Sequence, residues 1–78
     1  MLAAALAHLV KGLVEHPDDV AVVARDTNRG EVLEVRVNPE DLGRVIGRAG
    51  RTAKSLRLVI NALAKGRNVR VDIVDTDA

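Results

Sequence analysis

The 78-residue sequence contains no Phe, Tyr, Trp or Cys. Aromatic rings often hold the bases of single-stranded nucleic acids by stacking, so a nucleic-acid site in this chain would depend on backbone, aliphatic and charged groups. Without cysteine the chain has neither disulfides nor thiolate metal sites, and His8 and His16 are too few for a structural zinc cluster. We therefore expect a small domain that binds no metal and no cofactor.

Long apolar runs are also missing. The N-terminal "MLAAALAHLV" is interrupted by His8 and Lys11, well short of the ~20 residues that a membrane span requires. No cleavage site follows a basic leader. We expect an amphipathic helix here and a location in the cytoplasm, where reducing conditions suit a chain without cysteine.

The net charge of +1 conceals a segregation of charge along the chain. Eight Lys/Arg and no Asp/Glu lie between Leu42 and Val71, whereas the remaining residues carry four basic and eleven acidic side chains. Such asymmetry favours an anionic partner at one face. The alternative is an ordinary solvated helix surface.

Hydrophobic spacing predicts a helix, two strands of a hairpin, two further helices and a final strand. The turn "TNRG" separates two β-branched runs, Asn38 and Pro39 are typical of a helix start, and Gly47 and Gly66 are expected to end helices. The expected ranges are 2–15, 20–26, 31–37, 39–46, 51–65 and 68–74.

This order predicts an α+β domain with a three-stranded mixed sheet and three helices packed on one face. The second and third strands are joined by a helical crossover, so they should be parallel and right-handed, with the first strand antiparallel to the second. We expect one domain, residues 1–75, and a frayed tail, residues 76–78. The residues expected to face the core include Leu33, Val35 and Val37 of the second strand; Val69, Val71 and Ile73 of the third; Leu42, Val45 and Ile46; and Ala53, Leu56, Ile60 and Leu63, with Val59 beside them.

A glycine corner, "VIGRAGRTAK", separates the second and third helices. Peptide N–H groups at a helix N-terminus attract anions, and glycine at positions 47 and 50 permits positive φ angles and close approach of a phosphate backbone. The sequence does not fit a Walker loop or a Rossmann fingerprint, because Val45 stands where each motif needs glycine. Basic side chains surround the corner: Arg44, Arg48, Arg51 and Lys54.

The segment "LGRVIGRAGRTAKSLRLVI", Leu42 to Ile60, resembles the signature of the K homology (KH) domain, whose "IGxxG" corner is matched by Ile46 to Gly50. The element order resembles the bacterial type II KH fold. The whole chain, including "LVKGLVEHPDDV" and "NPEDLGRVIG", is most similar to the small single-KH proteins of the KhpA family.

The resemblance implies a groove for about four single-stranded nucleotides. It places backbone phosphates on Gly47, Arg48, Ala49 and Gly50, and bases on an aliphatic floor. Val45, Ile46 and an aliphatic residue of the second strand are the candidate floor residues. The expected phosphate contacts are Arg44, Arg48, Arg51 and Lys54, with Arg57 as a further candidate.

A second surface is expected on the long helix, where Leu58 and Ala62 point away from the core stripe. These two residues could form an isologous dimer contact, which would raise the avidity of a weak RNA module. The alternative is an ordinary exposed pair. The family resemblance implies self-association and pairing with a larger KH protein called KhpB.

No catalytic constellation is evident. The acidic pairs Asp18 with Asp19 and Glu40 with Asp41 lie at element ends without a partner base or nucleophile, so we interpret them as solvated surface. His8 is expected on the polar face of the first helix and His16 at its end. We expect no enzyme activity.

The leading hypothesis is a single-stranded RNA-binding protein of micromolar affinity at best, given nonspecific electrostatic binding of roughly 10⁻⁴ to 10⁻⁶ M. The resemblance further implies RNA-chaperone or post-transcriptional regulation, linked in some bacteria to cell shape and cell-wall homeostasis. The alternative hypothesis is a protein dimerisation module that contacts RNA only through its partner. Single-stranded DNA is a further possible ligand, because no residue is identified as a reader of the 2′-hydroxyl.

Overall fold

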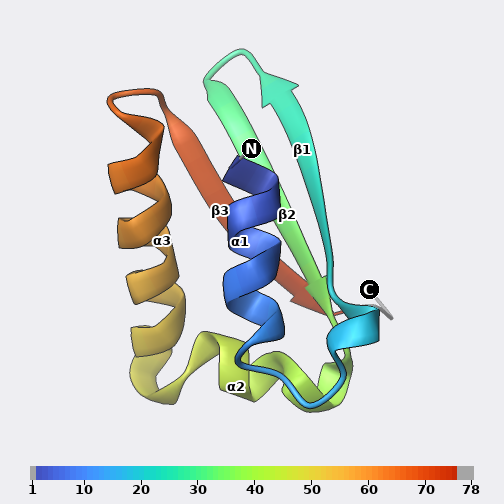
Figure 1. The fold of residues 1–78 in the computed structure, drawn as a ribbon. Coiled ribbons are helices and arrows are strands. Elements are labelled where there is room, and N and C mark those ends of the chain that lie inside the picture. The colour runs from blue at the N-terminus through green and yellow to red at the C-terminus, as the bar shows by residue number, and fades with distance from the viewer. Residues whose placement is uncertain (1, 76–78) are drawn as a thin grey trace.

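A computed structural model describes residues 2–75, which form a three-stranded sheet covered by helices on one face (Figure 1). The order of helices and strands expected from the sequence is confirmed. The expected frayed tail, residues 76–78, lies outside the described residues. The elements are α1 (Leu2–Lys11), the 3-10 turn η1 (Pro17–Asp19), β1 (Ala21–Thr27), β2 (Gly30–Val37), the 3-10 turn η2 (Pro39–Asp41), α2 (Leu42–Ile46), the 3-10 turn η3 (Arg48–Gly50), α3 (Arg51–Ala64) and β3 (Val69–Asp75).

The central strand of the sheet is β2. It pairs antiparallel with β1, where Val22 lies opposite Val35, and parallel with β3, where Leu33 lies opposite Val71. The mixed sheet expected from the hairpin and the helical crossover is thereby confirmed. In Figure 1, α1 lies in front of the sheet, α3 lies at the left next to β3, and α2 runs beneath both helices. Because β2 lies between them, β1 and β3 are the two edges of the sheet.

The core lies between the sheet and the helices. The inward residues of β2 are completely buried, as predicted from their alternation. Each such aliphatic side chain contributes about 1.5–3 kcal/mol on burial. The completely buried aliphatic residues are Leu6 and Val10 of α1, Leu33, Val35 and Val37 of β2, Val45 of α2, and Ile60 of α3.

The first helix is shorter than expected, because it ends at Lys11 and not near residue 15. The N–H of Gly12 donates to the carbonyl of His8 at 3.3 Å, and the N–H of Leu13 to that of Val10 at 2.9 Å, which closes the last turn. Further along, the N–H groups of Glu15 and His16 donate to the carboxylate of Asp41 and not to helical carbonyls. A tertiary contact therefore replaces the last turn of the expected helix.

Two apolar assignments to the core were wrong. Leu63 is 50% exposed, and Ala64 takes the place expected for it in the buried stripe of α3. Ile46 is 37% exposed. Because successive helical residues are rotated by about 100°, neighbours of a buried residue face a different direction, and α2 buries Val45 while turning Ile46 outward.

Candidate functional site

The corner between α2 and α3 is a sharp turn with left-handed backbone. Gly47 has φ 77° and ψ 170°, Ala49 has φ 57° and ψ 25°, and Gly50 has φ 75° and ψ 13°. An L-residue such as Ala49 pays roughly 1–2 kcal/mol for this conformation. The turn separates α2 from α3 where the sequence predicted a glycine corner, with Arg48 and Ala49 exposed and Gly47 and Gly50 half-buried.

The two glycines of the corner serve different purposes. A Cβ built on Gly47 would lie 2.7 Å from the backbone nitrogen of Thr52 and closer still to its Oγ1, so no side chain fits without movement of the backbone. A Cβ on Gly50 would meet nothing within 4 Å. Gly50 is favoured by its positive φ alone, whereas Gly47 is also required by close packing against the first turn of α3.

Two backbone amides at the corner are free. Internal acceptors take the N–H groups of Gly47 (Gly43 carbonyl, 2.8 Å), Gly50 (Gly47 carbonyl, 3.1 Å) and Arg51 (Arg48 carbonyl). Within residues 2–75, the N–H groups of Arg48 and Ala49 have no hydrogen-bond acceptor, and both residues are exposed. Unpaired amides beside the N-terminus of a helix attract anions.

The basic side chains around the corner fall into two groups. Arg48, Arg51 and Lys54 are exposed and form no ion pair with any described residue. Arg44 is also exposed, but its Nη2 lies 2.7 Å from Oε1 of Glu15. Arg57 donates from Nε to the carbonyl of Val71 at 3.3 Å and so connects α3 to the edge strand β3.

The apolar floor expected beneath the bases needs correction. Val45 is completely buried, so it supports the corner from within the core and presents no surface to a ligand. The helix-facing residues of β2 are also completely buried, because β2 is the central strand. The strand with a free edge next to α3 is β3. Ile46 is the candidate floor residue that the structure leaves accessible.

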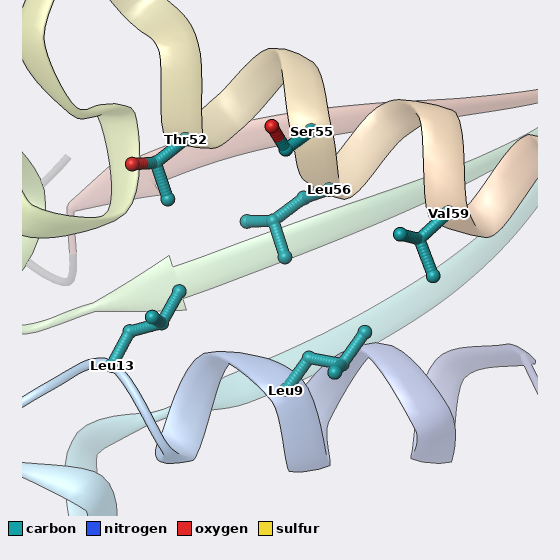
Figure 2. A pocket seen from close by; sticks show the side chains of 6 residues that line it. All are labelled: Leu9, Leu13, Thr52, Ser55, Leu56 and Val59. Carbon is teal, nitrogen blue, oxygen red and sulfur yellow. The ribbon is translucent and has the colours of Figure 1, made fainter.

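The outer surface of α3 has two apolar flanks. Leu58 is 63% exposed, and Ala62 is exposed one turn later. By helical spacing they share their flank with Lys54. The adjacent side of α3 faces α1, and Figure 2 shows Val59 and Leu56 of α3 directed toward Leu9 and Leu13. The open groove between them has a volume of about 200 Å³.

Sequence reasoning missed this groove, which is lined by Leu9, Leu13, Thr52, Ser55, Leu56 and Val59. Val59 was predicted to lie beside the core stripe, and no surface role was predicted for Leu9 or Leu13, although all three are exposed. The signal present in the sequence was the number of apolar residues on α1 and α3, which exceeds what one buried face of each helix can use.

Asp41 was also misjudged, because it is 1% exposed and is no surface carboxylate. It accepts hydrogen bonds from the N–H of Glu15 (3.1 Å), the N–H of His16 (2.9 Å) and Nδ1 of His16 (3.0 Å). No sequence pattern distinguishes it from the adjacent Glu40, because its partners lie 25 and 26 residues away.

The pKa values of this pair shift in opposite directions. The hydrogen bond to Asp41 raises the pKa of His16, with a further contribution from the negative charges of Asp41, Glu40 and Asp19. Burial by itself would raise the pKa of Asp41, but the hydrogen bonds from Glu15 and His16 outweigh burial and lower it. Both shifts favour an ionised pair.

The described part of the chain contains neither a candidate metal site nor a candidate membrane-spanning helix. Residues 2–75 contain no group of three or more His, Asp or Glu side chains that could hold a metal ion. Among these residues no helix is long and apolar enough to cross a bilayer.

Comparisons with known proteins agree with this architecture. A family model described as "KhpA/KhpB, KH domain" matches residues 3–74. Proteins named "RNA-binding protein KhpA" are similar over nearly their full length: one from Leifsonia xyli subsp. xyli is 75% identical over 96% of this chain and 99% of its own, one from Streptomyces coelicolor is 64% identical over 99% and 96%, and one from Mycobacterium tuberculosis is 53% identical over 94% and 90%. No solved structure matches. With its glycine corner, its sheet order and this full-length similarity, the chain belongs to the KhpA/KhpB family of KH domain proteins.

Proposed function

We propose that this protein binds single-stranded RNA at the corner formed by Gly47, Arg48, Ala49 and Gly50. The observation that carries the proposal is the pair of free amides, on Arg48 and Ala49, in an exposed turn whose nearest basic side chains have no acidic partner. The names of the relatives, which are RNA-binding proteins, support the same function.

In this proposal the RNA backbone lies on the corner. The amides of Arg48 and Ala49 donate to phosphate oxygens, and the absent side chains of Gly47 and Gly50 let the strand approach closely. Arg48, Arg51 and Lys54 neutralise phosphates, and Arg44 joins them when it leaves Glu15. Such binding depends on charge and falls steeply with salt.

The bases would extend from the corner along the flank of α3 toward the free edge of β3. Ile46 offers exposed aliphatic surface for them, and Val45 holds α2 in place from below. Aliphatic contact without aromatic stacking discriminates poorly between bases, so we expect weak sequence selectivity.

Assembly with a second KH domain would compensate for weak binding by avidity. The exposed apolar residues of α3 support such a contact, either at Leu58 and Ala62, as the sequence suggested, or at Val59 in the groove next to α1. The partner in this proposal is a second copy or a KhpB-like protein. The cellular role that we propose is RNA-chaperone activity or post-transcriptional regulation in the cytoplasm, acting on cell shape and cell-wall homeostasis.

A second candidate function is a dimerisation module that contacts RNA only through its partner. The observation in its favour is the amount of exposed aliphatic surface on the helical layer, where Leu9, Leu13, Leu58, Val59 and Leu63 are all accessible.

One variant distinguishes the two functions. Replacing Arg48 and Ala49 together by aspartate places negative charge beside the free amides, and we expect affinity for a fluorescein-labelled oligouridylate to fall by more than about tenfold in fluorescence anisotropy. The control replaces Asn28 and Arg29 by aspartate, because this exposed pair in the β1–β2 turn gives the same change of charge. The dimerisation module would be favoured if the corner variant kept the RNA affinity of the unmodified protein and if that affinity were seen only when a partner protein is present.

The assembly is tested separately by Leu58→Glu, on the outer face of α3, and Val59→Glu, about 100° around the helix on the side of the groove. Sedimentation velocity should show a monomer for the variant whose flank is the contact, and the other variant is its matched control. Unchanged mass in both variants would remove the self-association proposal. A DNA oligonucleotide of matching sequence tests whether the 2′-hydroxyl contributes.

A further inference from the structure

Arg44 differs from the other basic residues near the corner in having an acidic partner. Its Nη2 lies 2.7 Å from Oε1 of Glu15, which belongs to the connection between α1 and β1. Among the described residues, Arg48, Arg51 and Lys54 form no such pair. The basic residue of α2 is therefore already engaged when no ligand is present.

One carboxylate holds the Glu15 end of this ion pair beside the start of α2. Asp41, which directly precedes α2 and lies three residues before Arg44, accepts the N–H of Glu15 at 3.1 Å and that of His16 at 2.9 Å. An exposed ion pair usually gains little, because two long side chains must be ordered to make it. Here Asp41 fixes the backbone at Glu15 and Arg44 lies in α2, so only the two side chains must be ordered when Arg44 and Glu15 meet.

We propose that Glu15 is an internal competitor for RNA phosphate at Arg44 and lowers the affinity of the corner for RNA. This inference rests on the proposed function. A carboxylate oxygen and a phosphate oxygen require the same guanidinium N–H groups. Before Arg44 can contact a phosphate it must leave Glu15, so the ion pair with Glu15 is lost whenever the phosphate contact forms.

The competitor has a measurable signature in salt dependence. Binding to single-stranded nucleic acid weakens with salt: the logarithm of the association constant falls with the logarithm of the salt concentration, with a slope of about −0.7 for each phosphate neutralised. With Glu15 in place, Arg44 contributes only part of one such contact. Removing the carboxylate should release Arg44 for a full contact. Affinity should then rise, and the slope should become more negative by up to about 0.7, the value for one further phosphate contact.

The test compares Glu15→Gln with Glu40→Gln, each in the unmodified chain and in an Arg44→Gln background. Glu40 is the matched control because it is an exposed glutamate in the same region that makes no contact with Arg44. We expect Glu15→Gln to tighten binding of labelled oligouridylate about two- to fivefold, the range that a single exposed ion pair can give. Glu40→Gln should have a smaller effect, and Glu15→Gln should have none once Arg44 is replaced.

Four results would overturn the inference. Equal gains from Glu15→Gln and Glu40→Gln would show a general charge effect, and a gain that persists without Arg44 would show that Glu15 acts elsewhere. Binding of the unmodified chain with no gain at all from Glu15→Gln would remove the competitor and leave the proposed function intact. No binding by the unmodified chain would overturn both. Thermal unfolding should be nearly unchanged in Glu15→Gln, because only the side-chain contact is lost.

Discussion

The two ends of the short helix α2 are built in opposite ways. At its start, the buried carboxylate of Asp41 accepts three hydrogen bonds, and both backbone donors it meets are satisfied. At its end, the amides of Arg48 and Ala49 have no acceptor within residues 2–75, although the turn is exposed and surrounded by basic side chains. The same five-residue helix thus joins a saturated polar site to an unsaturated one.

This difference separates stability from ligand binding. A buried polar group that loses its partner costs free energy of unfolding, because water cannot replace the bond. An exposed amide loses nothing in the free protein, since water satisfies it, and it gains when an anion displaces that water. Changes at the start of α2 should therefore act on stability, and charge changes at its end should act on RNA binding.

The largest effect should come from Gly47, because a side chain there should affect both the stability of the domain and its binding of RNA. Gly47→Ala places a Cβ 2.7 Å from the backbone nitrogen of Thr52 and also carries the cost of a positive φ. We expect roughly 2–3 kcal/mol of destabilisation together with weakened RNA binding, measured by urea unfolding and anisotropy.

Gly50→Ala is the matched control for this change, because its Cβ meets nothing within 4 Å. It should cost only about 1 kcal/mol. If the two alanine variants were equally stable, the close contact between Gly47 and Thr52 would not constrain the corner.

A smaller loss of stability is expected from Asp41→Asn at the start of α2. An amide has one acceptor oxygen where the carboxylate has two, so either Glu15 or His16 loses its partner. We expect the midpoint of thermal unfolding to fall by about 5 to 10 °C, as followed by circular dichroism.

The adjacent Glu40→Gln provides the comparison, because Glu40 is exposed and its change should shift the midpoint little. An Asp41→Asn variant as stable as Glu40→Gln would break the distinction between the two ends of α2. Weaker binding of RNA to a fully stable Asp41→Asn protein would have the same consequence.

Most of the fold could be predicted from the sequence because its signals are local. Alternating valines in β2 and the glycines at positions 47 and 66 act within a few residues of themselves, and the strand order follows from the length of the connections. The corner was identified for the same reason. Its conformation is set by residues 47 to 50 and by the neighbouring Thr52.

The features that escaped prediction all depend on distant partners. Asp41 is buried because residues 25 and 26 positions away donate to it, and the same contact ends α1 early. Val45 and Ile46 are adjacent and equally apolar, yet packing against the sheet buries only the first. Helical periodicity gives the spacing of a buried stripe but not its width. Leu63 was therefore assigned to the core, although it lies at the edge of the buried stripe of α3 and is exposed.

The smallest effect should be a dependence of stability on pH that arises from His16 and Asp41 at the start of α2. His16 has a raised pKa, so its contribution is complete below its ordinary pKa of 6.5 and is lost as pH rises through the raised value of the folded state. Asp41 has a lowered pKa, so its contribution is complete above its ordinary pKa of 3.8 and is lost as pH falls through the lowered value. The pair therefore stabilises the domain most between these two ordinary pKa values.

Two variants separate the contributions of the two ends of α2. His16→Gln should flatten the alkaline side of a plot of unfolding midpoint against pH, since a neutral side chain has no charge to lose there. Arg48→Gln should leave that plot unchanged, because the corner contains no group that titrates in this range. An alkaline decline that persists in His16→Gln would mean that another group is responsible, and the start of α2 would then be saturated by hydrogen bonds without any contribution from charge.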